Sequence, residues 1–597
     1  MPRFLLVGAR MLRSLPMHGH RQQNHSRLRT TVRIRAISAF IFLLGFGLIV
    51  RLYVIQIHDA AAYRAKAERQ YVHTAKDVYN RGSIYFTTKD GEQVSAASMT
   101  SGYLLAVNPT TLQNPEAMYT TLQPYIMLSK DDFMMQATLP NRTYVEIDPK
   151  VSAENAAEIE KLKIPGVMLY RNQWRYYPGG DVAARTIGFV GYLGNDQTQL
   201  HGKYGLERYY DETLMRDNTV LSVNFFAEIF SNLGSLVYDN HDKKVGDVVT
   251  TIEPTVSRML DRVLQETQDT YHSKMTGGII MDPKTGAIYA MNVAPTFNLN
   301  EHAGVSLETF DNPLVQNVYE MGSIIKPLTM ASGLDSKVIT PESTYYDAGF
   351  LELNTKTIRN FDGKGRGTVN MQEVLNQSLN TGVSHVVSLM GNDRFRKYFM
   401  GLQLGSETGI DMPSEAHGLV STLDSPRDVD YATASFGQGI AMSPMETIRA
   451  LATLGNGGHL VTPHLASKIS YDDGTSKDIT YPNGAQVFTP ATSETITRML
   501  TTVVDKALRH GAVALPNHSV AAKTGTAQIA NPNGGGYYDD RYLHSFFGYF
   551  PSYDPKFIVF LYTIEPKGVQ YASETLTTPF IDITKFLINY YNIPPDR

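Results

Sequence analysis

The sequence predicts an α+β fold in which an antiparallel sheet lies beside a helical subdomain. Patterns typical of strands occur near residue 280 and again beyond residue 520, and a long helix-rich stretch separates them. Strands so far apart along the chain must meet in one sheet, so the intervening helices are expected at its side. For the N-terminal part of the chain, the sequence predicts a single transmembrane helix followed by an elongated module.

Length and composition indicate a globular protein of several parts. The chain has 597 residues, of which 42% are hydrophobic and 19% charged, and this length is too great for one core. The absence of cysteine excludes disulfides, thiolate metal sites and a cysteine nucleophile, and fits a location outside the reducing cytosol. Changes in composition divide the chain into a basic tail, an apolar anchor, a polar module and a C-terminal domain, at residues 1–35, 36–57, 58–245 and 246–597.

The N-terminus predicts a membrane anchor with a cytoplasmic tail. Residues 1–35 contain eight arginines and no acidic residue, and residues 36–57 are predominantly apolar apart from Arg51. A bilayer span needs about 20 apolar residues, which this stretch supplies if Arg51 extends toward the outer interface. The basic tail favours the positive-inside rule over nucleic-acid binding, because it adjoins an apolar run. The alternative is a cleaved signal peptide, for which Ala60-Ala61-Ala62 offers small residues.

The module at 58–245 shows regular elements without evident chemistry. Its sequence predicts helices at 61–70 and 153–162 and a strand at 100–107. Its sequence contains neither a pair of nucleophile and base nor a phosphate-binding loop. We therefore expect a binding or spacer role.

The C-terminal domain at 246–597 begins with a change of pattern. A strand is predicted at 247–252, and Pro254 suits the first turn of a helix that continues to about residue 270. Strands at 277–282 and 287–292 flank a turn sequence and predict a hairpin. Three more strands are predicted at 520–528, 545–550 and 557–564, with turns at Asp539-Asp540 and Asp554-Pro555.

The first motif, Ser323-Ile-Ile-Lys326, precedes an apolar helical run. Gly322 permits a turn, Ser323 suits a helix N-terminus, and Pro327 is tolerated only in the first turn. Residues three apart share one face of a helix, so we expect the Lys326 amine beside the Ser323 hydroxyl. A lysine can activate a serine only if burial or a second cation lowers its pKa. Ser323 is therefore the candidate nucleophile and Lys326 the candidate base.

The second motif, Ser378-Leu379-Asn380, lies in a polar segment between helical stretches. Ser378 could relay a proton, and the Asn380 side chain could hold a substrate amide. The same residues are also common in helix caps and turns, so this motif alone favours a structural role.

The third motif, Lys523-Thr524-Gly525-Thr526, lies on a predicted strand. A strand edge can pair with an extended peptide, and Gly525 would let the substrate backbone approach closely. Lys523 adds a cation that lowers the pKa of Lys326 and attracts a terminal carboxylate. Thr524 and Thr526 offer hydroxyl groups to the same carboxylate.

Each motif is weak by itself, because short triplets recur by chance. A second triplet, Lys284-Thr285-Gly286, occurs in the predicted hairpin turn and is best explained as that turn. The order of the three motifs and the predicted setting of each one carry the inference. Together they indicate a site for serine acyl transfer.

With these motifs the chain resembles the class B penicillin-binding proteins, membrane-anchored transpeptidases that cross-link peptidoglycan. The resemblance covers nearly everything after residue 36, and R-G-x-I at 81–84, G-L-E at 205–207 and G-Q-G at 437–439 add to it. In two places the chain departs from the family: Met321 replaces the usual proline, and the second motif reads Ser-Leu-Asn. Both changes lie outside the reacting groups and imply tuning rather than loss of activity.

The resemblance implies a penicillin-binding/serine β-lactamase-like transpeptidase domain after a pedestal or dimerisation-like module. Ser323 would attack the penultimate D-Ala carbonyl of a stem peptide and expel the last D-Ala, with Lys326 as base. Ser378 would pass a proton to the leaving amine, and an amine of a second stem would resolve the acyl-enzyme. β-Lactams would acylate Ser323 as mimics of D-Ala-D-Ala.

The remaining motif residues would bind and polarise the substrate. Asn380 would hold an amide, while Lys523 and Thr524 would hold the carboxylate beside Gly525. The backbone N–H groups of Ser323 and Thr526 would form the oxyanion hole.

The resemblance also implies partners and a place in the cell. The segment at 536–551 looks more like the septal type than the elongation type, which is the second candidate. No glycosyltransferase domain fits before residue 245, so a separate membrane glycosyltransferase and divisome proteins are expected in the bacterial inner membrane. We predict no cofactor, no metal and no nucleic acid. A β-lactamase would carry the same motifs, and a non-catalytic receptor for β-lactams or stem peptides is also compatible with them.

Overall fold

The computed structural model describes residues 24–53, 80–112, 114–193, 196–216, 244–482 and 484–597. The chain divides into two compact units, Met1–Asp77 and Val78–Arg597. In the first unit, helix α1 (Asn24–Tyr53) exposes large apolar side chains such as Phe42. Within the described residues, no helix is both long and apolar enough to cross a membrane. The end of the expected anchor at 54–57 and the helix expected at 61–70 lie outside those residues.

The centre of the second unit is a five-stranded antiparallel sheet in the order β16-β17-β18-β8-β9. Its strands come from both ends of the catalytic domain, as the sequence predicts. They span Ala521–Ala530 (β16), Tyr537–Phe550 (β17), Phe557–Ile564 (β18), Met275–Met281 (β8) and Ile288–Ala294 (β9). The turn between β8 and β9 holds the second K-T-G triplet, also as expected.

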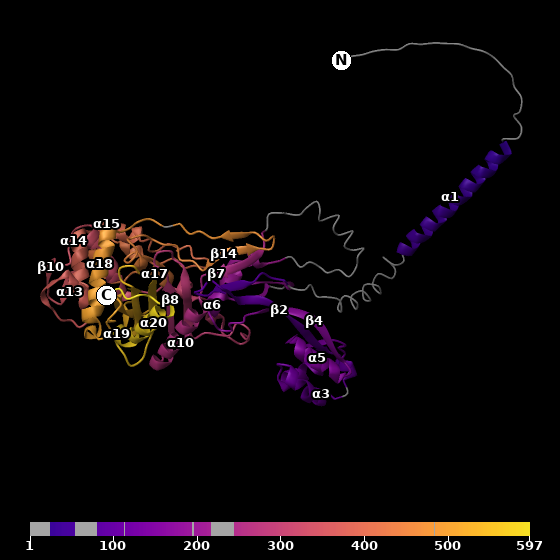
Figure 1. Cartoon of the computed structure of the whole chain (residues 1–597), viewed down its shortest axis with the longest axis horizontal. Helices are drawn as coiled ribbons and strands as arrows, with labels where there is room; N and C mark the ends of the chain where they lie inside the picture. Colours follow the sequence, from indigo (N-terminus) through magenta and orange to yellow (C-terminus); the bar gives the residue numbers. More distant parts are fainter. Residues whose placement is uncertain (1–23, 54–79, 113, 194–195, 217–243, 483) are drawn as a thin grey trace, which may run out of the picture. The chain divides into compact units, whose positions relative to one another are not determined.

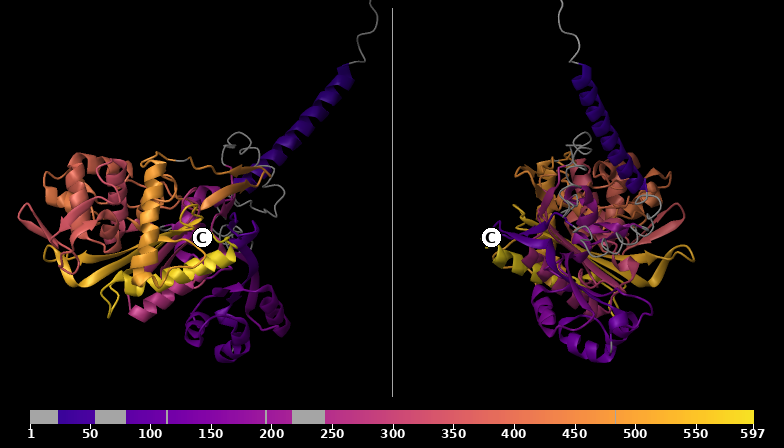
Figure 2. Two further views of the ribbon diagram at one scale, coloured as in Figure 1. Left: turned by 60° about the vertical axis from the view of Figure 1, so that its left-hand side comes forward. Right: turned by 90° about the vertical axis from the view of Figure 1, so that its right-hand side faces the viewer.

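Successive side chains of the sheet face two different cores, because strand residues alternate in direction. Phe546 packs with helices α10 (Pro254–Tyr271) and α20 (Thr577–Tyr590) on one face. Its neighbour Phe547 belongs to the larger core on the other face. The helical subdomain shares this larger core, so the predicted α+β fold with a sheet beside helices is confirmed (Figures 1 and 2).

One predicted turn is wrong. Asp539 and Asp540, expected in a turn, lie inside strand β17. The turn occupies residues 531–536, where Gly535 and Gly536 have φ values of 65° and 91° that favour glycine. Ala530 then pairs with Tyr537. The preceding pair joins Gln528 to Tyr542, so the register shifts between the two pairs and both aspartates lie in an irregular part of β17. The turn at 554–555 falls between β17 and β18 as predicted.

The helical subdomain also contains two small two-stranded sheets. They pair β10 (Thr344–Asp347) with β13 (Gly367–Asn370), and β11 (Phe350–Leu353) with β12 (Lys356–Arg359). The helices are α12 (Lys326–Asp335), α13 (Met371–Asn376), α14 (Asn380–Met390), α15 (Asn392–Gly401), α16 (Asp428–Ala434), α17 (Pro444–Ala452) and α18 (Pro490–Thr502).

A second sheet joins the N-terminal module to the catalytic domain. Strand β1 (Ile84–Thr87) pairs in parallel with β7 (Gly246–Thr250), which pairs with β14 (Ala466–Tyr471). The sheet therefore continues across the expected boundary at residue 245. Its full order is β15-β14-β7-β1-β2-β3, with β4 on β2; the other strands are β2 (Gln93–Val107), β3 (Val145–Val151), β4 (Val167–Tyr176) and β15 (Ser476–Asp478).

The N-terminal module has a small core of its own. Helices α3 (Pro115–Leu122), α4 (Lys130–Ala137) and α5 (Ala153–Leu162) pack there against β2 and β3 through buried residues such as Phe133. Strand β2 and helix α5 fall where the sequence predicts them. The long β2 runs from this core to its pairing with β1, and so connects the module with the second sheet.

A buried ion cluster holds this module together. Glu207 and Arg81 have side chains that are fully buried. Arg81 Nε and Arg175 Nε each donate to Glu207 at 2.6 Å, and Arg81 Nη1 donates to Asp211 at 2.7 Å. The structure thus brings the R-G-x-I and G-L-E segments together. Desolvated charges tolerate such burial when each has an opposite partner.

Replacement of Glu207 should unfold this module more easily. Glu207→Ala leaves two buried guanidinium groups without their shared carboxylate, and we expect a loss of about 3 to 5 kcal/mol in unfolding free energy. Urea unfolding would measure this loss through the fluorescence of Trp174, the single tryptophan, which is adjacent to Arg175 in the sequence. Glu494→Ala removes an exposed ion pair with Arg498 and should leave stability near wild type. Equal midpoints for the two variants would contradict the role of the cluster.

Candidate active site

Ser323 lies at the point where a tight turn enters a buried helix. A short 3-10 helix, η5 (Gly322–Ile325), runs directly into α12, with Pro327 in the first turn. Gly322 has φ 65°, and its N–H donates to the Gly437 carbonyl at 3.1 Å. A Cβ on Gly437 would lie 2.4 Å from the Gly322 carbonyl oxygen. The G-Q-G segment is thus packed directly against the residue that precedes Ser323.

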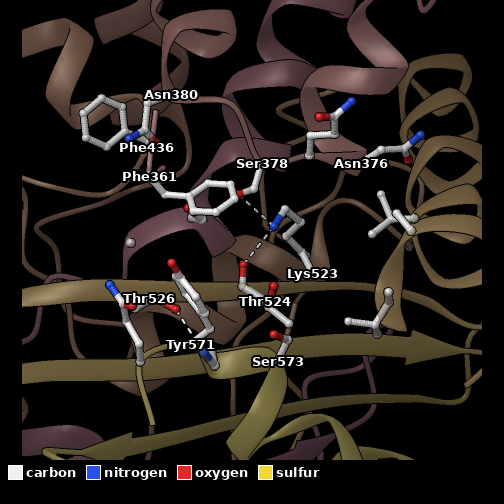
Figure 3. A pocket seen from close by; sticks show the side chains of 18 of the residues that line it. Phe361, Asn376, Ser378, Asn380, Phe436, Lys523, Thr524, Thr526, Tyr571 and Ser573 are labelled. Carbon is white, nitrogen blue, oxygen red and sulfur yellow. Dashed lines mark hydrogen bonds between the residues drawn. The ribbon is translucent and has the colours of Figure 1, made fainter. Parts of the chain in front are cut away.

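Two buried lysines meet at the hydroxyl of Ser378. Lys326 Nζ donates to the carbonyl oxygen of Ser378 at 2.5 Å and to its Oγ at 3.1 Å. Lys523 Nζ donates to the same Oγ at 3.1 Å and to the Thr524 carbonyl at 2.9 Å (Figure 3). The side chains of the three motifs thus meet in one place. Among the described residues the Lys326 amine has no hydrogen bond to Ser323, so that expected pair stays a prediction.

Burial shifts the proton equilibria of both lysines. Lys326 is 0% exposed and Lys523 is 3% exposed. Burial lowers the pKa of Lys326 well below its ordinary value, and the Lys523 cation lowers it further. Burial alone lowers the pKa of Lys523 to about 7. The lowered pKa of Lys326 favours its neutral amine, which is the form that can accept a proton.

The backbone around Ser378 is held in an uncommon conformation. Ser378 has φ 54°, in the left-handed region, between α13 and α14. This geometry is sparsely populated for residues other than glycine and persists when its surroundings hold it. At the start of α14, the Asn380 amide donates to the Arg359 carbonyl at 2.8 Å. Buried Asp347 accepts from Thr381 Oγ1 at 2.8 Å and from Asn360 Nδ2 at 2.9 Å, which fixes the same turn of helix to the small sheets.

The third motif lies on β16, an edge strand of the central sheet. Thr524 and Thr526 line a cavity, and Thr526 Oγ1 accepts from the Ala572 N–H at 3.0 Å. Gly525 has a different neighbour from the one expected. A Cβ there would lie 2.4 Å from Ser545 Oγ, 2.8 Å from the Met321 carbonyl oxygen and 3.0 Å from the Ile324 nitrogen. In this structure, Gly525 permits close approach to the Ser545 side chain on β17 and to the segment carrying Ser323.

The cavity has a volume of about 640 Å³ and includes most of the expected site. Six of the eight predicted residues line it: Ser323, Ser378, Asn380, Lys523, Thr524 and Thr526. Lys326 and Gly525 lie behind this surface. Among the described residues the Ser323 hydroxyl has no hydrogen-bond partner, so it is available to a ligand in the cavity.

Several cavity residues were not predicted from the sequence. Phe361, Arg509, Tyr571 and Ser573 line the same space from three separate segments (Figure 3 labels the first and the last two). None of them belongs to a motif, and no local pattern identifies them. Only the folding of the helical subdomain onto the sheet brings them beside Ser323.

Glu320 is a further residue that the sequence did not single out. Its Oε1 accepts from the Gly439 N–H at 2.9 Å and from the Tyr537 hydroxyl at 3.2 Å. Burial raises the pKa of Glu320. The carboxyl group therefore links the segment before Ser323 with the G-Q-G loop and with β17. Within the described part of the chain, no cluster of three or more His, Asp or Glu side chains could hold a metal ion.

Comparison with known families agrees with this geometry. The model of the penicillin-binding protein transpeptidase domain matches residues 276–585, and that of the penicillin-binding protein dimerisation domain matches residues 77–224. The chain belongs to the penicillin-binding protein transpeptidase family. This confirms the family predicted from the motifs.

Individual proteins of the family are similar to this chain over most of their length. Stage V sporulation protein D of Bacillus subtilis is 30% identical over 570 residues, which cover 92% of this chain and 84% of that protein. Peptidoglycan D,D-transpeptidase FtsI of Escherichia coli is 25% identical over 76% of this chain and 74% of its own.

Solved penicillin-binding proteins share the fold. Penicillin-binding protein 3 of Mycobacterium tuberculosis, in complex with aztreonam, has a TM-score of 0.66 and 20% identity, covering 87% of this chain and 98% of the other. Penicillin-binding protein 2X of Streptococcus thermophilus has a TM-score of 0.67 and 20% identity, covering 87% and 81%.

A methyl group on Gly525 should disturb the segment that carries Ser323. We expect Gly525→Ala to lose about 1 to 3 kcal/mol of stability, because the Ser545 side chain and the backbone atoms of Met321 and Ile324 must move. We also expect its acylation by a fluorescent penicillin to slow at least about tenfold, since a 1 Å displacement can be that costly.

Gly401→Ala is the matched control for this change. Its Cβ would meet only the Val487 side chain, at an ordinary 3.6 Å. Acylation of Gly525→Ala at the wild-type rate would show that no close packing exists at this point.

Proposed function

We propose that this chain is a serine D,D-transpeptidase that cross-links peptidoglycan stem peptides through an acyl-enzyme on Ser323. The observation that carries the proposal is the meeting of Lys326 and Lys523 at Ser378 Oγ, in the wall of the cavity that Ser323 lines. A serine needs a base, and buried Lys326 has the lowered pKa that this role requires. Similarity to proteins named peptidoglycan D,D-transpeptidase supports the same reaction.

In the proposed first step, Ser323 Oγ attacks the penultimate D-Ala carbonyl. Its proton passes to Lys326, an ester bond forms, and the amide bond to the last D-Ala breaks. Ser378, which accepts hydrogen bonds from both lysines, relays a proton to the departing amine. An amine of a second stem then attacks the ester, and Ser323 regains its proton.

The substrate-binding roles follow from the edge strand. The donor stem would add to β16 as an extended strand, with its terminal carboxylate held by Lys523 and Thr524. Backbone N–H groups of Ser323 and Thr526 would stabilise the developing oxyanion. Asn380 would release Arg359 or share its amide in order to hold the stem. In this proposal Gly525 acts by letting β16 approach η5.

We place this activity in septal wall synthesis at the outer face of the cytoplasmic membrane. The septal-type segment at 536–551 and the similarity to FtsI and to a sporulation protein support this choice over elongation. Residues 36–57 would anchor the chain, with the tail at 1–35 inside. Apolar side chains exposed on α1 support the anchor. A separate membrane glycosyltransferase and divisome proteins would be the partners.

The nucleophile can be tested by labelling with a fluorescent penicillin. We expect stable labelling of the wild type and none of Ser323→Ala, because no acyl-enzyme can form without the hydroxyl. Ser388→Ala, which removes an exposed serine outside this cavity, should label normally. Label on Ser323→Ala would refute the assignment, and loss of label from the wild type within seconds would indicate a β-lactamase instead.

The pH profile of acylation tests the lysine pair. Lys326 must be neutral to act, so the rate should fall as pH drops through its lowered pKa. Lys523→Gln removes the cation that lowers this pKa, so the acid limb should move to higher pH. The difference should be largest below pH 7, where Lys523 itself is charged.

Lys284→Gln supplies the control for this profile. It removes the lysine of the second K-T-G triplet, which lies in the exposed β8–β9 turn, where Lys284 pairs with Asp554. This change should leave the acid limb at the wild-type pH. An acid limb at the same pH in Lys523→Gln and wild type would refute the electrostatic coupling.

A further inference from the structure

Arg509 occupies an unusual position in the cavity wall. It is the second residue of the segment η8 (Leu508–Gly511), which follows the helical turn η7 (Val503–Ala507). Arg509 and His510 have φ values of 45° and 57°, so two successive residues other than glycine adopt the left-handed conformation. Arg509 lines the cavity, and its neighbours His510 and Lys506 do not.

The guanidinium group of Arg509 is anchored by carbonyl groups and not by acids. Its Nε and Nη2 donate to the Ser573 carbonyl at 3.3 and 3.2 Å, and Nη2 also donates to the Glu574 carbonyl at 3.4 Å. The Glu574 carboxylate is engaged elsewhere, since it accepts from the Tyr571 N–H at 3.1 Å. Among the described residues, Nη1 has no partner and no carboxylate pairs with Arg509. An exposed, uncompensated cation therefore faces the cavity.

This cation is additional to the groups already assigned to the substrate. Under the proposed function, Lys523 and Thr524 take the terminal carboxylate of the donor. The volume of about 640 Å³ lies in the range that holds drug-sized ligands. More of the stem peptide than its last two residues can therefore enter the cavity. Arginine is well suited to a second carboxylate, because its planar N–H groups match the two oxygens.

We propose that Arg509 binds a side-chain carboxylate of the acyl donor. The donor stem would then carry a diamino dicarboxylic acid, with a free carboxylate, in place of a diamino monocarboxylic acid such as lysine. This inference rests on the proposed function and adds a substrate class to it. Arg509 acts here as a binding and specificity-determining residue, since it takes no part in the transfer of protons or of the acyl group.

The test compares two penicillins that differ by one carboxylate. Carbenicillin is benzylpenicillin with an added side-chain carboxylate, so the ratio of their second-order acylation rates isolates recognition of that group. We expect Arg509→Gln to lower the carbenicillin to benzylpenicillin ratio about tenfold, which is the scale of one charge-assisted hydrogen bond. Arg509→Lys, which keeps the charge, should retain part of the preference. Both rates are measured on the full chain by competition with a fluorescent penicillin.

Two neighbouring changes are the controls. Lys506→Gln removes a cation from the same segment, and His510→Gln alters the adjacent left-handed residue, but neither side chain lines the cavity. Both should keep the wild-type ratio. An unchanged ratio in Arg509→Gln would overturn the inference. An equal loss of both rates would also overturn it, because Arg509 would then only shape the cavity.

Two further outcomes are also decisive. If Arg509→Gln does not fold, the salt dependence of the wild type decides. Screening should lower the carbenicillin rate more than the benzylpenicillin rate, and equal slopes would overturn the inference. If neither penicillin acylates the wild type, the proposed function fails. If the wild type is acylated but Arg509→Gln keeps the wild-type ratio of the two rates, only the inference about Arg509 fails.

Discussion

Two lysine amines buried against one serine hydroxyl constrain the arrangement of the whole catalytic site. Burial of a cation is costly, so Lys326 and Lys523 need acceptors, and Ser378 Oγ serves both. For this contact to form, β16 must lie against the start of α12, and the turn before α14 must reach between them. The same burial lowers the pKa of both amines and so makes a base available near Ser323. Burial of the two amines thus costs folding stability but gives Lys326 the lowered pKa that a base requires.

The surrounding structure explains how this arrangement is maintained. Ser378 keeps a left-handed backbone because the buried Asp347, Asn360 and Thr381 hold the first turn of α14 against the two small sheets. On the opposite side, Gly525 and Gly437 let two backbones approach the segment that carries Ser323. Side chains at these glycines would separate the elements. Precise placement of the reacting groups therefore depends on contacts that themselves take no part in the chemistry.

The N-terminal module is built on a different device. The ion cluster around Glu207 lies at the centre of its contact with the residues before β1, and β1 in turn pairs with β7. The second sheet thus contains strands from both sides of residue 245. The boundary predicted from composition separates the catalytic domain from the N-terminal module, but the strand pairing crosses it. Backbone N–H and C=O groups can pair whatever the composition of the two segments.

The sequence alone was sufficient for the elements with strong local patterns and for the three motifs. Continuous apolar strands such as β18, the helix that begins at Pro254 and the second K-T-G triplet at Lys284 lie where their patterns place them. Tertiary structure decided what depends on distant partners: the strand at Asp539, the neighbour of Gly525 and the presence of Arg509 in the cavity. Local pattern records the preferences of one segment, whereas pairing and burial depend on which segment lies opposite, and only the folded chain determines that.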